Sequence, residues 1–295
     1  MRLAIATCES PPVPDSDAER LAPALAERGV DSELVVWSDP DADWSGYDLV
    51  WISSTWDYHE RLDEFLAWLR RAAEATPVRN PPALIEWNVD KRYLRELGEA
   101  GVPVIPTVWL EDGDGGPAVR EAARRGWTEV VVKPAVDLGA ARLERTSAVG
   151  LRAAVERVER PALVQPFLES LASEGELSLV YLGGELSHAV RKTPAEGDFR
   201  IQEQYGGRYE AIEASAEATA IGDRVIETIG PHVAKARDDG EPVPLYGRAD
   251  LVRGPKGELC VIELELIEPS LYLDVVGEAE SARFADLLAA TMERL

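Results

Sequence analysis

The sequence predicts a mixed fold, with an α/β domain followed by α+β architecture, and three observations support this. Residues 1–87 alternate short apolar runs with amphipathic helical segments, a pattern typical of a small parallel sheet. The part of the chain after residue 168 contains two glycine-centred hairpins flanked by helices, which is typical of antiparallel sheets. The length of 295 residues corresponds to about two domains, or three small ones.

In the first domain, 1–87, apolar runs predict strands at 3–8, 32–37 and 49–53 and helices at 18–28 and 62–75. The second helix is the clearest, since Leu62, Phe65, Leu66 and Leu69 recur at helical spacing. Prolines between 77 and 82 then interrupt the pattern. This alternation of strands and helices indicates a Rossmann-like parallel sheet.

A second, smaller α/β module is expected over 88–168. It has helices near 91–100, 119–125 and 148–158, and strands at 129–133 and 162–165. The third unit, 169–295, begins with a hairpin around Gly183-Gly184. A polar loop at 193–207, a helix at 214–237, a second hairpin around 254–257 and a helix at 278–295 follow. Hairpins with flanking helices make this unit α+β.

Charge excludes several kinds of partner. Lysine and arginine number 31 against 54 aspartates and glutamates, a net charge of −23 that repels nucleic acid and anionic membranes. We therefore expect a small-molecule partner, and an anionic one needs a local positive pocket or a metal ion. The two cysteines show no paired spacing, and no signal peptide or membrane span is evident. These features favour a cytoplasmic protein; a homo-oligomer remains possible.

The segment 259–268 of the last hairpin carries the strongest chemical signal. Side chains of a strand alternate between faces, so Cys260, Ile262, Leu264 and Leu266 are expected in the core. Glu263 and Glu265 then share the other face with Val261 and Ile267.

The partner strand adds two more charges to that face. A two-residue turn at Pro255-Lys256 would set Asp250 opposite Val261 and Arg248 opposite Glu263. Three crowded acids repel one another, and a magnesium ion would relieve the repulsion. The alternative is a solvated acidic face, and a register error of one residue would break the cluster.

Basic residues near glycines suggest phosphate contacts. Lys133 ends a β-branched strand and Lys91 opens a helix, although either lysine could lie on the surface. Lys192 leads into the loop 193–207, whose Arg200 and glycines could close over phosphates or form a disordered basic loop. GxGxxG and the GxxxxGK[ST] phosphate loop are both absent from the sequence, which disfavours dehydrogenases and P-loop enzymes.

Taken in order, these motifs resemble the ATP-grasp superfamily from about Asn88 onward. The segment 163–168 followed by Glu169 and Glu176 is similar to bacterial glutathione synthetases and ribosomal-protein glutamate ligases. The segment 190–192 leading to 197–200 and Gly206-Gly207 is similar as well. Arg248-Ala249-Asp250 followed by Glu263-Leu264-Glu265 resembles the family's metal-binding pattern, although many relatives carry asparagine at the position of Glu265.

The resemblance implies an ATP-grasp fold with an N-terminal Rossmann-like domain (1–87), a lid (88–168) and a catalytic core (169–295). It implies ATP and Mg²⁺ as cofactors and the formation of an amide through an acylphosphate. The implied ATP-binding residues are Lys91, Lys133, Gln165, Phe167, Leu168, Glu169 and Glu176. The implied metal ligands are Asp250, Glu263 and Glu265, and the implied catalytic residues are Arg248, Lys192 and Arg200.

A narrower resemblance concerns the segments 51–58 and 267–272, which are similar to a subgroup that includes the ATP-grasp enzyme of cycloserine biosynthesis. It implies an amino-acid-like substrate and ring closure within that substrate. Thr55, Asp57, His59 and Ser270 are the candidate substrate residues, and packing between domains is the alternative role for this tryptophan-rich region. A phosphotransferase acting on a hydroxyl and a non-catalytic nucleotide-binding module are the competing functions.

Overall fold

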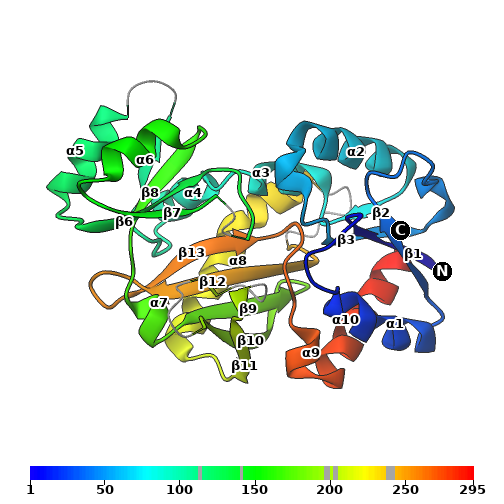
Figure 1. Ribbon diagram of the computed structural model, residues 1–295. Helices are drawn as coiled ribbons and strands as arrows, with labels where there is room; N and C mark the ends of the chain where they lie inside the picture. Colours follow the sequence, from blue (N-terminus) through cyan, green and yellow to red (C-terminus); the bar gives the residue numbers. More distant parts are fainter. Residues whose placement is uncertain (112–114, 140–141, 196–199, 202–204, 237–242) are drawn as a thin grey trace.

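The protein consists of three sheets with helices packed around them (Figure 1). The computed structural model describes residues 1–295 except 112–114, 140–141, 196–199, 202–204 and 237–242. The expected loop 193–207, with Gly197, therefore lies partly outside the described residues. None of the described helices is long and apolar enough to cross a membrane.

The N-terminal sheet is parallel, in the order β2-β1-β3-β4. Its strands are β1 (Arg2–Thr7), β2 (Asp31–Val36), β3 (Leu49–Ser54) and β4 (Val78–Arg79). Alternate residues face opposite layers: Leu3 and Trp51 pack toward α1 (Ser16–Glu27), whereas Ala4 and Ile52 pack toward α2 (Leu62–Ala75). Helix α2 has the bounds that its apolar spacing predicts. Two short 3₁₀ turns, Trp44–Gly46 and Tyr58–Glu60, flank β3.

The largest sheet is antiparallel, in the order β11-β10-β9-β12-β13. Its strands are β9 (Glu176–Leu182), β10 (Glu185–Thr193), β11 (Arg208–Ile212), β12 (Tyr246–Arg253) and β13 (Leu259–Glu265), with the short helix α7 (Ser170–Ser173) before β9. Both hairpins form as their glycine turns predict. The long helix α8 (Ala216–Ala236) covers one face, where it packs on Leu179, Ala249 and Val261.

The third sheet is antiparallel in the order β5-β8-β6-β7 and lies at the upper left of Figure 1. Its strands are β5 (Val108–Leu110), β6 (Glu129–Pro134), β7 (Glu144–Ser147) and β8 (Ala162–Pro166). Helices α5 (Gly116–Arg124) and α6 (Leu151–Arg157) bury one face of it against Val130, Val132 and Val164. The opposite face, with Lys133 and Gln165, is left for the site described below.

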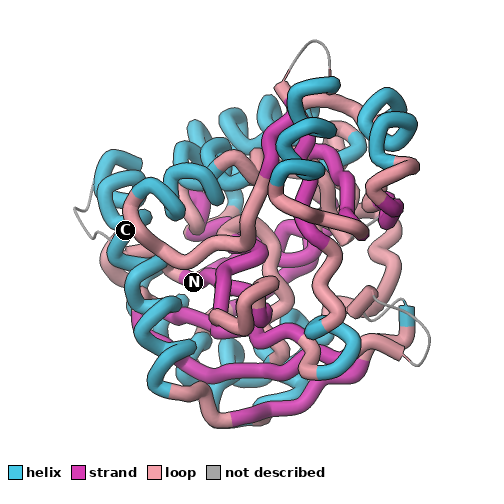
Figure 2. The backbone as a smooth tube through the Cα atoms, turned by 90° about the vertical axis from the view of Figure 1, so that its left-hand side faces the viewer, coloured by secondary structure: helices cyan, strands magenta, loops and turns pink. Residues whose placement is uncertain are grey.

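Two segments pack away from their neighbours in sequence. Helices α3 (Pro82–Asn88) and α4 (Tyr93–Glu99) join the core under the large sheet. After α9 (Leu273–Val276), the last helix α10 (Glu278–Met292) returns to the N-terminal sheet, where Phe284 and Leu288 pack with Leu3 and Trp51. Figure 2 shows the same arrangement from the side, with both termini in one part of the molecule. The expected divisions at 87 and 168 remain predictions, and these segments pack across them.

Candidate active site

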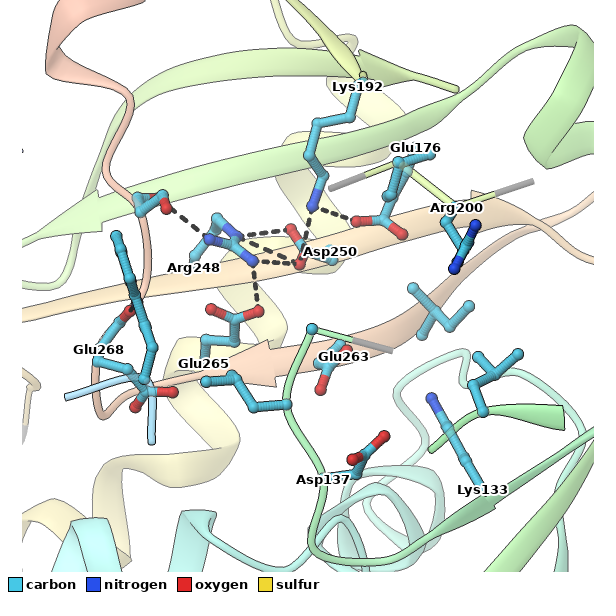
Figure 3. A pocket seen from close by; sticks show the side chains of 18 of the residues that line it. Lys133, Asp137, Glu176, Lys192, Arg200, Arg248, Asp250, Glu263, Glu265 and Glu268 are labelled. Carbon is cyan, nitrogen blue, oxygen red and sulfur yellow. Dashed lines mark hydrogen bonds and ion pairs between the residues drawn. The ribbon is translucent and has the colours of Figure 1, made fainter. Parts of the chain in front are cut away.

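A cavity of about 600 Å³ lies between the three sheets, and most of the predicted site residues line it (Figure 3). The cavity is lined by the large sheet on one side, by the free face of the β5–β8 sheet on another, and by loops after β1 and β3 of the N-terminal sheet. Carboxyl ends of parallel strands are a common place for ligands in open α/β sheets. The predicted residues that line the cavity are Lys91, Lys133, Gln165, Phe167, Leu168, Glu176, Lys192, Arg200, Arg248, Asp250, Glu263, Glu265, Asp57, His59 and Ser270.

The register of the last hairpin differs from the predicted one. Asp250 lies opposite Glu263 and Arg248 opposite Glu265, a shift of two residues. One residue of the shift comes from a longer turn, which pairs Arg253 with Leu259, and the other from a bulge that leaves Ile262 without a partner on β12. The backbone of Val261 turns outward, donating to the carbonyl of Pro103 and accepting from the amide of Ile105. The prediction that set Asp250 opposite Val261 and Arg248 opposite Glu263 is therefore wrong.

The bulge also reverses the faces of the strand to which two side chains point. Val261 is completely buried in the core under α8, whereas Ile262 lines the cavity beside Glu263. The expectation that Ile262 is a core residue and that Val261 shares the carboxylate face is wrong for the same reason, since the inserted residue reverses the alternation. Glu263 and Glu265 nevertheless both reach the cavity, so the cluster survives the error in register.

Arg248 binds two of the predicted metal ligands. Its Nε and Nη2 each lie 2.9 Å from an oxygen of Asp250, its Nη2 also donates to Glu265, and its Nη1 donates to the carbonyl of Ser270 at 3.1 Å. Ser178 adds a hydrogen bond of 2.6 Å to Asp250. Burial opposes the charge on Asp250, but Arg248 and Lys192 outweigh it and hold the pKa of this carboxyl below its usual range.

Lys192 joins this network from the neighbouring strand. Its Nζ lies 3.2 Å from Asp250 and also pairs with Glu176, and all three side chains are buried (Figure 3). Burial alone would lower the pKa of Lys192, yet the two carboxylates raise it, so the ammonium stays charged. The lysine is therefore a fixed cation inside the cavity.

Lys91 holds the third predicted ligand. Its Nζ lies 3.0 Å from Glu263 and also donates to the carbonyl of Asp137, and its own backbone amide binds Ala135. Only 7% of Lys91 and 6% of Lys133 is exposed, which excludes the alternative that these lysines lie on the surface. Burial also lowers the pKa of Lys133. This leaves a cation whose charge a bound anion would stabilise.

The wall of the cavity near β8 is mostly apolar. Leu168 packs with Ile105 and near Ile262, and Gln165 donates to Thr107 at 3.0 Å. The guanidinium of Arg145 lies over the ring of Phe167, 3.5 Å from its centre. A flat aromatic base fits an apolar slot edged by such polar groups.

The N-terminal wall contains two of the four predicted substrate residues, Asp57 and His59. Asp57 accepts a hydrogen bond of 2.7 Å from the indole of Trp37, and His59 lies beside it with a buried, unpartnered Nδ1. Thr55 is completely buried and does not line the cavity. Trp51 packs against Tyr246 and Phe284, as the packing alternative for this region predicts, whereas Trp56 lines the cavity.

The three predicted metal ligands, Asp250, Glu263 and Glu265, form ion pairs with lysine and arginine side chains. No group of three or more His, Cys, Asp or Glu side chains in the described ranges is arranged to hold a metal ion. Burial, with repulsion from Asp250 and Glu263, outweighs Arg248 and raises the pKa of Glu265 to about 7. This marks an excess of buried negative charge, which suits oxygen-ligated Mg²⁺ if the phosphates supply the other ligands.

Two predicted ATP contacts behave differently. Glu176 is buried in the cavity, whereas Glu169 is exposed at the start of α7 and does not line it. Arg200 lines the cavity and lies over the ring of Tyr205, 3.7 Å from its centre. The structure thus brings together every predicted site residue except Thr55 and Glu169.

Sequence reasoning missed several lining residues. Asp137, Ile262, Glu268 and Tyr272 all line the cavity. Glu268 follows the carboxylate strand directly, in the run Glu263-Leu264-Glu265-Leu266-Ile267-Glu268. An acid at the end of this run, just before Pro269, could have been predicted to lie near the other carboxylates. Ile262 could not be found, because alternation assigns it to the core.

Comparisons with known proteins find relatives over nearly the whole chain. Residues 3–80 match the family model described as the N-terminal domain of D-cycloserine synthetase DcsG. The chain is 34% identical over 290 residues to the cycloserine biosynthesis protein DcsG of Streptomyces lavendulae, covering 95% of each chain. It is 30% identical over 184 residues to a glutathione synthetase of Parasynechococcus marenigrum, covering 58% of this chain and 55% of the relative.

Solved structures show the same fold. The crystal structure of D-cycloserine synthetase DcsG has a TM-score of 0.88 and 32% identity, and the match covers 99% of this chain and 100% of that one. The D-alanine–D-alanine ligase of Bacillus anthracis, at 13% identity and a TM-score of 0.67, shares the fold. The three-sheet architecture is thus the ATP-grasp fold, and the chain belongs to the ATP-grasp ligases, enzymes that form amide bonds at the expense of ATP, in the family of DcsG.

Proposed function

We propose that this protein uses ATP and Mg²⁺ to activate the carboxylate of a small amino-acid derivative and closes a ring within it, giving a product of the D-cycloserine type. One observation carries the proposal: a single cavity joins the buried Arg248–Asp250–Glu265 network to the lysines and to the N-terminal wall. The likeness to DcsG over 95% of both chains supports ring closure rather than linear ligation.

The apolar wall suits the nucleotide. In this proposal the base lies between Leu168 and Ile262, while Lys133 and Lys91 contact the phosphates. Glu176, at the base of β9, faces the same cavity and is placed to accept from the ribose hydroxyls. The buried lysines of the cavity explain how a chain with a net charge of −23 could bind a triphosphate.

Mg²⁺, held by Asp250, Glu263 and Glu265, would neutralise charge on the phosphates during transfer. For this, the carboxylates must exchange part of their contact with Arg248 and Lys91 for the ion. Arg248 is then free to orient the substrate carboxylate and to stabilise the oxyanion of the later tetrahedral intermediate. Lys192 and Arg200 are placed to stabilise negative charge on the γ-phosphate during phosphoryl transfer, since both line the same cavity.

The reaction has two balanced steps. The substrate carboxylate oxygen forms a bond to the γ-phosphorus as the bond to ADP breaks. A nitrogen of the same substrate then attacks the acyl carbon, phosphate leaves, and the nitrogen loses a proton to complete the amide. Enclosure in the cavity keeps water from the acylphosphate.

The test couples ADP release to mass spectrometry of the product. Wild-type protein is given ATP, Mg²⁺ and a panel of D- and L-serine derivatives bearing a second nitrogen nucleophile. Ring closure predicts a product lighter than its substrate by one water, whereas a phosphotransferase gives a stable ester that has gained a phosphoryl group. Binding of ATP with no product from any substrate would leave only a nucleotide-binding module. Glu263→Gln should lose activity at limiting Mg²⁺; full activity there would refute the metal assignment.

A further inference from the structure

The lysines and arginines that line the cavity come from some segments of the chain and not from others. Four acidic side chains, and no lysine or arginine, are among the described lining residues from 1–60 and 268–274. All the cationic lining residues belong to the other walls: Lys91, Lys133, Lys192, Arg200 and Arg248. The segments 1–60 and 268–274 thus contribute acids but no lysine or arginine of their own, although Arg248 reaches Ser270 and the ring of Tyr272 from the large sheet.

Glu268 is the most deeply buried of these four acids. Only 3% of it is exposed, and its Oε2 is buried without a hydrogen-bond partner. Burial, with repulsion from Glu265, raises the pKa of this carboxyl well above its usual range. A buried carboxylate without a partner destabilises the protein, and an ion pair with a bound cation would reduce this cost.

The nearest cations are already engaged. Lys91 is held by Glu263 and by the carbonyl of Asp137, and Arg248 is held by Asp250, Glu265 and the carbonyl of Ser270. Among the described contacts neither reaches Glu268. Figure 3 shows Glu268 on the side of the cavity away from Lys133 and Lys192.

Other lining residues from the segments 1–60 and 268–274 suit a small ammonium ion. His59 leaves a buried Nδ1 without a partner. The indole of Trp56 donates to the backbone carbonyl of Glu268 at 3.4 Å, and Trp56 and Tyr272 supply aromatic surface to the same cavity. Aromatic faces and a carboxylate together are a favourable setting for a desolvated amine.

We propose that Glu268 is the counter-ion for a protonated primary amine of the substrate, which makes it a specificity-determining residue. The inference rests on the proposed function and extends it: the retained amine binds at Glu268, while the reacting carboxylate lies toward Arg248. The site therefore selects amines over hydroxy acids of the same shape, and over N-acylated amino acids, which carry no positive charge. The amine that binds Glu268 is not the attacking nitrogen, because a protonated nitrogen has no free electron pair.

The binding experiment uses D-cycloserine, which keeps a primary amine, and its N-acetyl derivative, which has no charge there. Calorimetry is done on protein loaded with Mg²⁺ and ADP. The wild type should prefer D-cycloserine by about tenfold or more, the value of one charged hydrogen bond, and Glu268→Gln should abolish that preference. The affinity for ADP should not change in this variant. Glu293→Gln, which removes an exposed acid at the end of α10, is the matched control.

The outcomes separate the two proposals. If the wild type binds D-cycloserine and Glu268→Gln keeps the preference, the role of Glu268 is wrong and ring closure stands. If the wild type does not bind D-cycloserine, the proposed product is wrong. The inference about Glu268 is then decided by ADP release with D- and L-serine and with glycerate, which carries a hydroxyl in place of the amine. Equal release with glycerate, or no release with either serine, overturns it.

Glu268 also borders a second cavity of about 20 Å³ beside Tyr58, and a purely structural role there would have another signature. In that case Glu268→Gln would lower the melting temperature while leaving the preference for the amine unchanged. A melting curve recorded for each variant detects this result, which counts against the proposal. Should Glu268→Gln fail to fold, the preference of the wild type for the amine over its N-acetyl form decides alone.

Discussion

The carboxylate of Asp17, in the first turn of α1, accepts the backbone amide of Leu271 at 2.6 Å and that of Leu273 at 2.8 Å. One buried side chain from the start of the chain thus fixes the loop that carries Ser270 and Tyr272 into the cavity. His188 secures the same loop by contacting the carbonyl of Leu271 at 2.7 Å. The loop is therefore positioned from two different sheets.

Replacing Asp17 tests this support. In Asp17→Asn the amide NH₂ faces a backbone N–H, so one buried donor loses its acceptor at a cost of about 1–3 kcal/mol. We expect a lower melting temperature and a higher KM for the amino-acid substrate. Asp63→Asn is the control, because Asp63 is an exposed acid in the first turn of α2. Equal effects of the two variants would show that the charge near a helix start, rather than the loop contact, is responsible.

Arg248 should be irreplaceable by lysine. Lysine cannot make the paired contacts to Asp250 while also reaching Glu265 and Ser270. Loss of one donor to a developing oxyanion lowers kcat by about 10²–10³-fold, and we expect a loss of this size in Arg248→Lys. Arg253→Lys, on the same strand but pairing with the exposed Glu174, should stay within about twofold. Steady-state ADP release compares them, and similar losses would contradict the assigned role.

The bulge in β13 predicts opposite effects at two adjacent residues. Ile262→Ala should weaken ATP binding about tenfold, since it removes apolar contact from the cavity wall, with little change in melting temperature. Val261→Ala should do the reverse, costing about 1–3 kcal/mol of stability because Val261 is fully buried in the core. Calorimetric titration with ATP and a thermal melt of each variant decide the matter. The alternating register first predicted would exchange the two results.

We expect Lys133 to contribute to nucleotide binding but little to the stability of the fold. Lys133→Met keeps the length of the side chain but removes the cation, so affinity for ATP should fall by about 10- to 100-fold. The exposed Lys256, in the turn between β12 and β13, provides the control Lys256→Met. Because desolvation of the charged form is no longer required, the melting temperature of Lys133→Met should hold or rise. Unchanged ATP affinity would remove Lys133 from the phosphate site.

Much of the site could be predicted because its chemistry is local in sequence. The carboxylates of β13, the Arg248-Ala249-Asp250 run and the lysines at element ends each lie in short recognisable segments. The bulge could not be predicted from the hairpin alone, because β13 also pairs with a distant segment there: Val261 bonds to Pro103 and Ile105. Periodicity shows that a residue is buried, but it does not show which partner covers it.

The same limit explains the unpredicted packing of α10. Its apolar residues predict a buried helix, yet nothing local indicates that Phe284 and Leu288 pack with Leu3 and Trp51 of the first sheet. Glu268 escaped notice for a different reason. Its importance comes from the lack of a partner for its buried oxygen, a property of three-dimensional surroundings rather than of residue type.

The return of α10 has a consequence for synthesis of the chain. While a ribosome is still translating residues before Glu278, the face of the N-terminal sheet that bears Leu3 and Trp51 lacks part of its cover. That sheet therefore completes its packing only after the final helix has emerged, although its strands were made first. Nascent chains stalled before residue 278 should be digested by protease within the first 80 residues, and chains that include α10 should resist.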